Sequence, residues 1–559
     1  MIKNILHTLE PMLVTYLRKN RYTKKEFFQD CLSGLSVAIV ALPLAMAIAI
    51  ASNLPPERGL FTAIVAGFLI SALGGSRFQI GGPTAAFIVT VALVAMKHGY
   101  EGLVIATMMA GVMLVVMSLL RAGELIKFIP YPVIIGFTSG IALLIVFSQL
   151  KDFFGLTIEH MPPDFIEKLI LYVEHIGETN FFALAIALLS IYITFYVRKN
   201  YPAIPAPIVV VTLSALLVWV FGIPVDTIES RFGAIPSMLP SPSFPEITFE
   251  KIRLLFPDAM TIALLAAIES LLSAVVADGM SGTKHKSNTE LFGQGIANIA
   301  SSIFGGLPAT GAIARTATNV KAGAVSPISG IMHALWLLVF MMLLAPLIVK
   351  IPLAALSAIL IVVAWNMAEI KHLKSIVKAP AADIGVLFVT FTLTVLVDLN
   401  IAIQAGISLA SILFINSMMK STKIRAYSED EDTDDPDSIV KKVIPKGVEV
   451  YELDGPLFFG ISEKLVDTLI SFETMPDVFI LRLRHVPMID AAGLHSLEVL
   501  NERLRHNNAT LILSGVHKSV HVYLQKTKLD RAIGEENIVN HIDKALKRSE
   551  VILNQKLFS

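Results

Sequence analysis

Two charged residues stand alone in long apolar stretches of the sequence. Glu269 lies in the middle of 259–277, and Arg315 ends the stretch 305–315, which holds no other charge. Burial disfavours the charged form of a lone carboxylate, so Glu269 can take up a proton or coordinate a cation when its surroundings change. Ser273, four residues later on the same helix face, can supply a second oxygen. An arginine inside a membrane costs roughly 2.5–3.5 kcal/mol and is expected to face protein or water.

Two glycine-rich motifs share one pattern, 74–86 (GGSRFQIGGPTAA) and 305–315 (GGLPATGAIAR). Each has a Gly-Gly pair, a short interruption, and then a helix that opens with small residues. A helix N-terminus exposes unpaired N–H groups and about half a positive charge, and Pro83 suits a first helical turn because its missing N–H is no loss. The motifs therefore predict an anion site between two facing half-helices, with Arg315 adding positive potential. Tight packing of small residues, and an Arg315 that caps a helix or pairs with Glu269, are the structural alternatives.

The composition indicates a membrane protein, with 54% hydrophobic and 16% charged residues, whereas soluble domains carry about 25% charged residues. Cys31 is the only cysteine, which excludes an intrachain disulfide, and the polar, basic segment 1–31 shows no cleavable signal. Apolar runs predict fourteen segments, of which the third and the tenth are too short to cross alone. They are 32–50, 59–74, 83–95, 102–120, 131–149, 181–197, 206–221, 257–277, 290–304, 311–322, 326–348, 352–367, 382–397 and 400–419.

The distribution of basic residues supports this count. With fourteen crossings, both termini lie on the same side of the membrane. The N-terminal stretch and the loops on that side hold twenty Lys and Arg residues before residue 426, and the loops on the other side hold eight. Positive charge marks the cytoplasmic side, so both termini are expected there. The second glycine motif follows the first by seven segments, and this odd offset gives the two halves opposite orientations. The sequence thus predicts an inverted-repeat architecture, all-α in the membrane.

The chain changes character after Met419. Segment 420–440 contains the acidic run 429–435 and is expected to be a solvated linker. Beyond it, strands at 447–453, 477–483 and 509–514 alternate with helices at 462–473, 491–507 and 539–549. This pattern predicts a cytosolic α/β domain over 441–559.

Several of these stretches resemble the SulP (sulfate permease) family of anion transporters, namely 54–61 (LPPERGLF), 81–84, and 267–295 with Glu269. The resemblance runs over essentially the whole chain. It implies seven plus seven segments over 32–419, a core of segments one to four and eight to eleven, a gate made of the others, a homodimer and an elevator-like motion. The substrate-binding residues that it implies are Leu44, Ile48, Thr84, Ala85, Ala86, Gly311, Ala312, Ile313 and Arg315, and the coupling residues are Glu269 and Ser273.

The C-terminal region is similar to STAS domains through 448–461 and 490–494. Bacterial anti-sigma-factor antagonists carry a phosphorylated serine in the second of these stretches, where this chain has Ala491 and Ala492. Regulation by that phosphorylation is therefore not expected, whereas binding of a cytosolic regulator remains possible.

Three positions bear on the substrate and on the coupling ion. Leu44 stands where many family members have glutamine. Glu269 and Ile313 stand where the sodium-coupled bicarbonate members have aspartate and threonine, and the loss of that hydroxyl argues against a sodium site. Segment 359–369 resembles an enterobacterial C4-dicarboxylate transporter of the family.

The sequence hence predicts proton-coupled uptake of C4-dicarboxylates across a bacterial inner membrane. Sodium-coupled bicarbonate uptake, proton-coupled sulfate uptake, a passive anion channel and a membrane-anchored signalling protein are the alternatives. The expected partners are a small anion, a proton (or sodium), membrane lipid and a second copy of the chain. The sequence shows no nucleophile motif, metal-ligand cluster or phosphate loop, so neither an enzyme, a cofactor, a metal site nor a nucleic-acid partner is expected.

Overall fold

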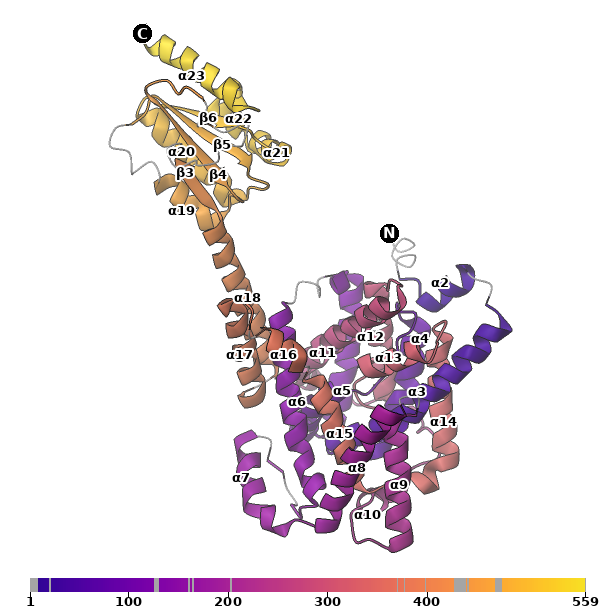
Figure 1. Ribbon diagram of the computed structural model, residues 1–559. Coiled ribbons are helices and arrows are strands. Elements are labelled where there is room, and N and C mark those ends of the chain that lie inside the picture. The colour runs from indigo at the N-terminus through magenta and orange to yellow at the C-terminus, as the bar shows by residue number, and fades with distance from the viewer. Residues whose placement is uncertain are drawn as a thin grey trace. The chain divides into compact units, whose positions relative to one another are not determined.

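The computed structural model describes residues 9–19, 22–124, 130–158, 161–162, 165–201, 204–368, 370–376, 378–397, 399–426, 439, 442–467 and 475–557. The chain forms two compact units, Met1–Ala410 and Ser411–Ser559 (Figure 1). The first unit is helical, and the second is built around a small sheet. The acidic run predicted as a linker lies outside the described residues.

Each of the fourteen predicted segments coincides with helix in the structure, which confirms the predicted fold class. The third and fourth segments form one long helix interrupted at Gly99, whose φ of 69° and ψ of 177° are not helical. The bounds are α3 (Lys24–Ala51), α4 (Pro56–Leu73), η1 (Ala85–Phe87) continuing into α5 (Ile88–Leu119), α6 (Tyr131–Phe154), α8 (Phe181–Asn200), α9 (Ala206–Phe221), α11 (Phe249–Ser281), α12 (Ser287–Ile303), α13 (Ile313–Lys321), α14 (Ile328–Ile348), α15 (Leu353–Met367), α17 (Ala381–Leu396) and α18 (Leu399–Ser421). Additional short helices are α2 (Met12–Lys19), α7 (Phe165–His175), α10 (Ile228–Phe232) and α16 (Ile370–Ile376).

Two helices begin at a capping residue, several residues before the apolar run from which their start was predicted. Helix α3 begins eight residues before the predicted 32, because Thr23 accepts from the backbone N–H of Glu26 in a capping box. Helix α11 likewise begins at Phe249, before the predicted 257, behind the N-cap Thr248. Hydropathy marks the apolar middle of a helix, whereas its polar end turns are fixed by caps.

Helix packing in the first unit repeats with an offset of seven segments. In the two halves α4 is equivalent to α12, and α14 is equivalent to α5. Helix α4 packs against α14, and in the same way α12 packs against α5. Helix α3 contacts α14 in the same way as its counterpart α11 contacts α5. The pairing of equivalent helices with exchanged partners is what an inverted repeat requires.

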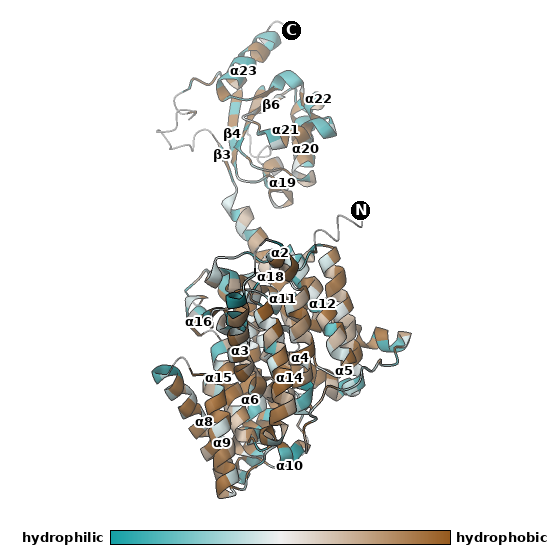
Figure 2. Cartoon of the chain, turned by 90° about the vertical axis from the view of Figure 1, so that its right-hand side faces the viewer, coloured by the Kyte–Doolittle hydropathy of each residue, from teal (hydrophilic) through white to brown (hydrophobic). Residues whose placement is uncertain are grey.

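The outer surface of the first unit is apolar. Nine helices among the described residues are long and apolar enough to cross a membrane, and α9 and α17 are shorter apolar helices. Large side chains such as Phe181, Trp219 and Phe221 are exposed, and Figure 2 shows hydrophobic residues along most of these helices. An exposed apolar surface of this extent is stable in lipid and not in water.

The second unit holds a five-stranded sheet with the order β3-β4-β5-β6-β7, in which β3 is antiparallel to β4 and the other neighbours are parallel. Alternate residues of β5 face opposite sides: Phe479 and Leu481 join one apolar cluster, and Val478 and Ile480 join another. The strands are β3 (Lys423–Ala426), β4 (Val448–Asp454), β5 (Val478–His485), β6 (Thr510–Ser514) and β7 (Ile538–Val539). The helices are α19 (Phe459–Asp467), α20 (Ala491–His506), α21 (Lys518–Thr527), α22 (Leu529–Ile533) and α23 (Ile542–Leu557).

Two details of this unit differ from the prediction. Strand β3 lies at the start of the predicted linker 420–440, where its backbone pairs with β4 through the register Lys423↔Asp454. Met418 and Met419, at the end of α18, pack against the apolar cluster of the sheet. Backbone pairing and methionine packing give no periodic signal, so composition could not reveal either feature.

The close crossing of α5 and α12 yields a test of the packing. A Cβ added to Gly295 would lie 2.7 Å from the carbonyl oxygen of Gly111, so we expect Gly295→Ala to destabilise the protein by about 1–3 kcal/mol. A Cβ added to Gly279 in α11 meets nothing within 4 Å, so Gly279→Ala is the control and should leave the melting temperature unchanged or raised. Thermal unfolding in detergent compares the two, and equal melting temperatures would contradict this packing.

Candidate functional site

The two glycine-rich motifs meet in a short antiparallel ladder inside the first unit. Strands β1 (Gly81–Gly82) and β2 (Thr310–Gly311) pair in the register Gly81↔Gly311 and Gly82↔Thr310. The N–H of Ala312 donates to the carbonyl of Ile80 at 2.8 Å. Because the strands are antiparallel, η1–α5 and α13 leave the ladder in opposite directions, and both helices begin beside it.

Neither helix start at the ladder is capped by a side chain. Thr84 precedes η1 and Ala312 precedes α13, and neither makes a side-chain hydrogen bond to the helix that follows. The first N–H groups of both helices thus keep their partial positive charge for a ligand. A threonine normally caps the helix that it precedes, and here its hydroxyl is engaged elsewhere.

That hydroxyl binds Glu269. Thr84 Oγ1 donates to Glu269 Oε2 at 2.7 Å, which places the carboxylate of α11 beside the start of the first half-helix. Glu269 keeps part of its side chain accessible, whereas Thr84 is buried. The carboxylate therefore lies beside the ladder, held by the hydroxyl of Thr84.

Arg315 is buried and contacts the opposite motif. Its Nη2 donates to the carbonyl of Pro83, and its Nη1 has no hydrogen-bond partner among the described residues. Arg315 and Glu269 interact electrostatically but form no ion pair in the described part of the chain. Among the described residues Arg315 thus neither caps a helix C-terminus nor pairs with Glu269, and it contacts the carbonyl that precedes η1 instead.

Ser273 does not contact Glu269 in the structure. Its hydroxyl donates to Thr316 Oγ1 at 3.1 Å, and Thr316 Oγ1 accepts from the N–H of Ile80 at 3.1 Å. Through Thr316, Ser273 thus links α11 to α13 and to Ile80, which directly precedes β1.

Most of the predicted substrate-binding residues are buried around the ladder. Ala85, Ala86, Gly311 and Ala312 are buried with Thr84 around the ladder, and Ile48 of α3 belongs to the same apolar cluster as Ala85 and Ala86. Leu44, Ile313 and Glu269 are partly accessible, and Ala314 is exposed.

Buried polar residues that the sequence analysis did not select hold the ladder in place. Glu290 Oε2 accepts from the N–H groups of Gly75 and Ser76 at 2.8 and 3.0 Å. Glu290 Oε1 accepts from Ser270 Oγ at 3.1 Å and from Gln294 Nε2 at 2.9 Å. With four donors around it, this carboxylate is compensated without a cation.

The second loop is held in an equivalent way. Asn298 bonds both backbone groups of Ala309, with its Nδ2 donating at 2.8 Å and its Oδ1 accepting at 2.8 Å. Thr62 of α4 accepts from the N–H of Leu307 at 2.6 Å. Glu290, Gln294 and Asn298 repeat every four residues along α12, and this polar stripe in an apolar segment was the sequence signal for them.

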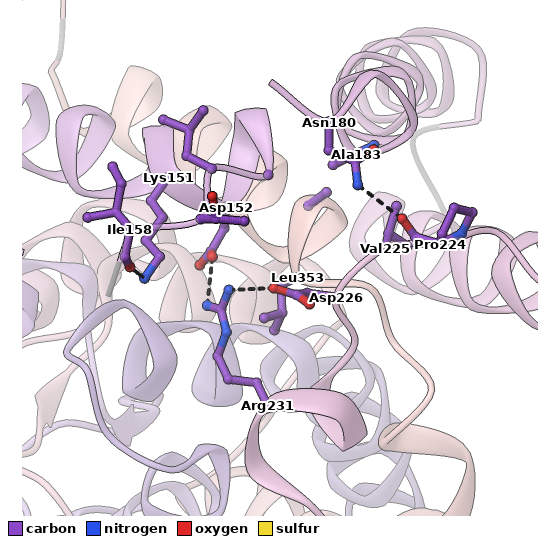
Figure 3. A pocket seen from close by; sticks show the side chains of 14 residues that line it. Lys151, Asp152, Ile158, Asn180, Ala183, Pro224, Val225, Asp226, Arg231 and Leu353 are labelled. Atoms are coloured by element: carbon purple, nitrogen blue, oxygen red, sulfur yellow. Dashed lines mark hydrogen bonds and ion pairs between the residues drawn. The ribbon is translucent and has the colours of Figure 1, made fainter. Parts of the chain in front are cut away.

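A separate cavity of about 570 Å³ lies away from the ladder, at the ends of α6 and α10 (Figure 3). Arg231 bridges Asp152 at 2.7 Å and Asp226 at 2.9 Å, and Asn180 Nδ2 donates to the carbonyl of Pro224 at 3.0 Å. Arg231 is neutralised by these carboxylates and links α10 to the end of α6, so its charge is not available to an anion. Among the described residues, no three His, Cys, Asp or Glu side chains gather as a metal ion would require.

Comparison with known proteins agrees with this geometry. Residues 27–390 match the sulfate permease family, and residues 440–545 match the STAS domain. The chain belongs to the sulfate permease family. It is a multi-pass membrane protein of a transporter family, as the family resemblance of the sequence predicted.

Individual members of the family resemble the chain over nearly its full length. The putative sulfate transporter YvdB of Bacillus subtilis is 41% identical over 93% of this chain and 98% of its own length. The bicarbonate transporter BicA of Picosynechococcus is 30% identical over 93% of this chain and 94% of its own length.

Solved structures of related proteins have the same fold. The transmembrane domain of a cyanobacterial BicA is 29% identical with a TM-score of 0.62 and covers 70% of this chain and 98% of its own. The structure of SLC26A9, at 19% identity and a TM-score of 0.86 over 100% of this chain and 95% of its own, shows a common fold.

Because four donors surround the carboxylate of Glu290, we expect even the nearly isosteric substitution by glutamine to destabilise the protein. Glu290→Gln replaces one acceptor oxygen by an NH₂ group that faces donors, so we expect a loss of about 1.5–3 kcal/mol of stability and weaker anion binding through a loosened loop 74–80. Glu250→Gln, at the exposed start of α11, is the matched control. Melting temperature and ligand-induced stabilisation measure both variants. A Glu290→Gln protein as stable as the control would show that the carboxylate does not hold the loop.

Proposed function

We propose that this protein is a secondary active transporter that takes up a small dianion together with a proton. The observation that carries the proposal is the ladder, because it brings two uncapped helix starts and the guanidinium of Arg315 to one place beside Glu269. The proposal rests on the charge of this arrangement and on the family to which the chain belongs.

The charges favour a ligand with two negative charges. Arg315 contributes one positive charge, and each of the two helix starts is equivalent to about half a charge, which gives about two in total. An ionised Glu269 cancels about one of them. The match with a dianion is therefore complete only when Glu269 carries a proton.

Because binding of the dianion depends on the protonation of Glu269, transport of the dianion is coupled to transport of the proton. A protonated Glu269 raises the affinity for the dianion, and by linkage the bound dianion raises the affinity of Glu269 for its proton to the same degree. Empty and doubly loaded carriers are then the favoured states, as proton symport requires. Because Ile313 stands where the sodium-coupled bicarbonate members have threonine and brings no hydroxyl, the proposal favours a proton over sodium.

C4-dicarboxylates and sulfate both fit this charge. The resemblance of segment 359–369 supports a C4-dicarboxylate, and the name of the relative from B. subtilis supports sulfate. Bicarbonate, named for BicA, carries one charge and fits the protonated site less well. We place a C4-dicarboxylate first and sulfate second.

Two groups of helices in the membrane unit can move relative to each other during transport. We infer that helices α3–α5 and α11–α14 form a core that carries the ladder past a gate of α6, α8, α9, α15, α17 and α18 in an elevator-like motion. We infer also a homodimer in a bacterial inner membrane with both termini in the cytoplasm, where the STAS domain can bind a regulator.

Uptake into proteoliposomes tests the function. We expect labelled succinate or sulfate to accumulate against its gradient when the outside is acidified, and a sodium gradient alone to drive nothing. Accumulation of bicarbonate driven by sodium would favour the sodium-coupled alternative. Equilibration without accumulation would indicate a channel.

Glu269→Gln tests the coupling in the same assay. The neutral amide resembles the protonated acid, so we expect the variant to bind the dianion and exchange it across the membrane, with no proton-driven accumulation and no dependence on pH between 5 and 8 beyond the ionisation of the substrate itself. In the wild type, affinity should fall as the pH rises, because Glu269 then loses its proton. A variant that still accumulates substrate with the pH profile of the wild type would refute coupling through Glu269, and Glu250→Gln again serves as the control.

A further inference from the structure

Helix α7 exposes an apolar stripe on the surface of the first unit. The stripe has the spacing i, i+3, i+4 and i+7 of one helix face, and its members are Ile166, Leu169, Ile170 and Val173. Val173 is the most exposed of the four, at 67%. Glu167 and Glu174 are also exposed and lie seven residues apart on a different face of the same helix. The exposed side of α7 is therefore amphipathic.

Helix α7 folds back against α6. The N–H of Asn180 donates to the carbonyl of Phe154 at 2.9 Å, so the chain returns after α7 to the end of α6. The hydroxyl of Tyr172 donates to the carbonyl of Phe147 at 2.8 Å, and the rings of Phe165 and Phe147 pack with their centroids 4.8 Å apart. Helix α7 also contacts α17, and Figure 1 shows it beside α6 at the edge of the first unit.

These contacts place α7 within the depth of a membrane. Phe147 lies seven residues before the end of α6, which is about 10 Å along the helix axis. The 24 residues of α6 rise about 36 Å, whereas the hydrocarbon layer of a bilayer is about 30 Å thick. A point about 10 Å inside this span is therefore surrounded by hydrocarbon, and an apolar stripe at that level is stable against lipid.

We propose that α7 is an interfacial helix whose apolar stripe contacts the acyl chains of the leaflet in which α6 ends. The face with Glu167 and Glu174 then points toward headgroups and water. Leu188 of α8 and Phe388 of α17 are exposed apolar residues as well, so α7 extends a surface that the bilayer already covers. Because α7 contacts both α6 and α17, it holds these two helices at one depth in the membrane. The orientation proposed above makes this leaflet the outer one.

Spin labels at two adjacent positions test the proposal in proteoliposomes. In a Cys31→Ser background, Val173→Cys and Glu174→Cys place the label on the apolar face and on the acidic face. Oxygen dissolves in lipid, whereas a nickel chelate stays in water. We expect the label at 173 to collide more with oxygen than with the chelate and the label at 174 to show the inverse ratio, as measured by power saturation of the spectrum.

Two exposed valines elsewhere in the chain calibrate the measurement. Val112 lies in the apolar span that ends at Leu119, so a label at Val112→Cys reports lipid. Val551 lies in α23 of the second unit, so a label at Val551→Cys reports water. A label at 173 with the ratio found at 112 would support the proposal, and one with the ratio found at 551 would overturn it.

A label at 173 that neither reagent reaches would show that protein covers the stripe, and this result would also overturn the contact with lipid. Disulfide cross-linking of the Val173→Cys protein would then show whether the cover is a second copy of this chain. The measurement needs folded protein in a bilayer but no transport. A failure of the proposed function would appear instead as wild-type proteoliposomes that accumulate no anion, so the two failures are distinguishable.

Discussion

Four backbone residues in the ladder hold together the two halves of the membrane unit. Residues 74–84 and 305–312 are mostly non-helical, and unpaired N–H and C=O groups in hydrocarbon cost several kcal/mol each. Such segments are stable only when protein satisfies them. The pairing of Gly81 and Gly82 with Thr310 and Gly311 does so at the centre, and it fixes where the two short helices begin.

Several other backbone groups of these loops are bound by side chains from the other repeat. Glu290 of α12 holds Gly75 and Ser76 in the first loop, and Thr62 of α4 holds Leu307 in the second. Each loop is thus built into the repeat that it faces. This exchange couples the repeats into one structure, and it leaves the N–H groups of the helix starts free for a ligand because the loops themselves are already paired.

The electrostatics of the site follow from this frame. Burial makes each charge costly and also strengthens its effect on neighbours, since little water screens it. Arg315 is oriented by the carbonyl of Pro83, and Glu269 by the hydroxyl of Thr84, so both are tied to the same turn of chain. A ligand or proton that binds at one of them changes the energy of the other, and this is the basis of the proposed coupling.

The sequence by itself determined the apolar segments of the membrane unit, the inverted repeat and the α/β fold of the second unit, because these depend on hydrophobic periodicity and segment length, which are local properties. The matching glycine motifs also allowed the ladder region, Arg315 and Glu269 to be selected. Only the tertiary structure decided how these groups pair. Ser273 contacts Thr316 instead of Glu269, and Arg315 contacts Pro83 instead of a carboxylate. These pairings depend on the approach of helices that are distant in the chain, and a spacing along one helix shows which residues share a face but not what that face meets.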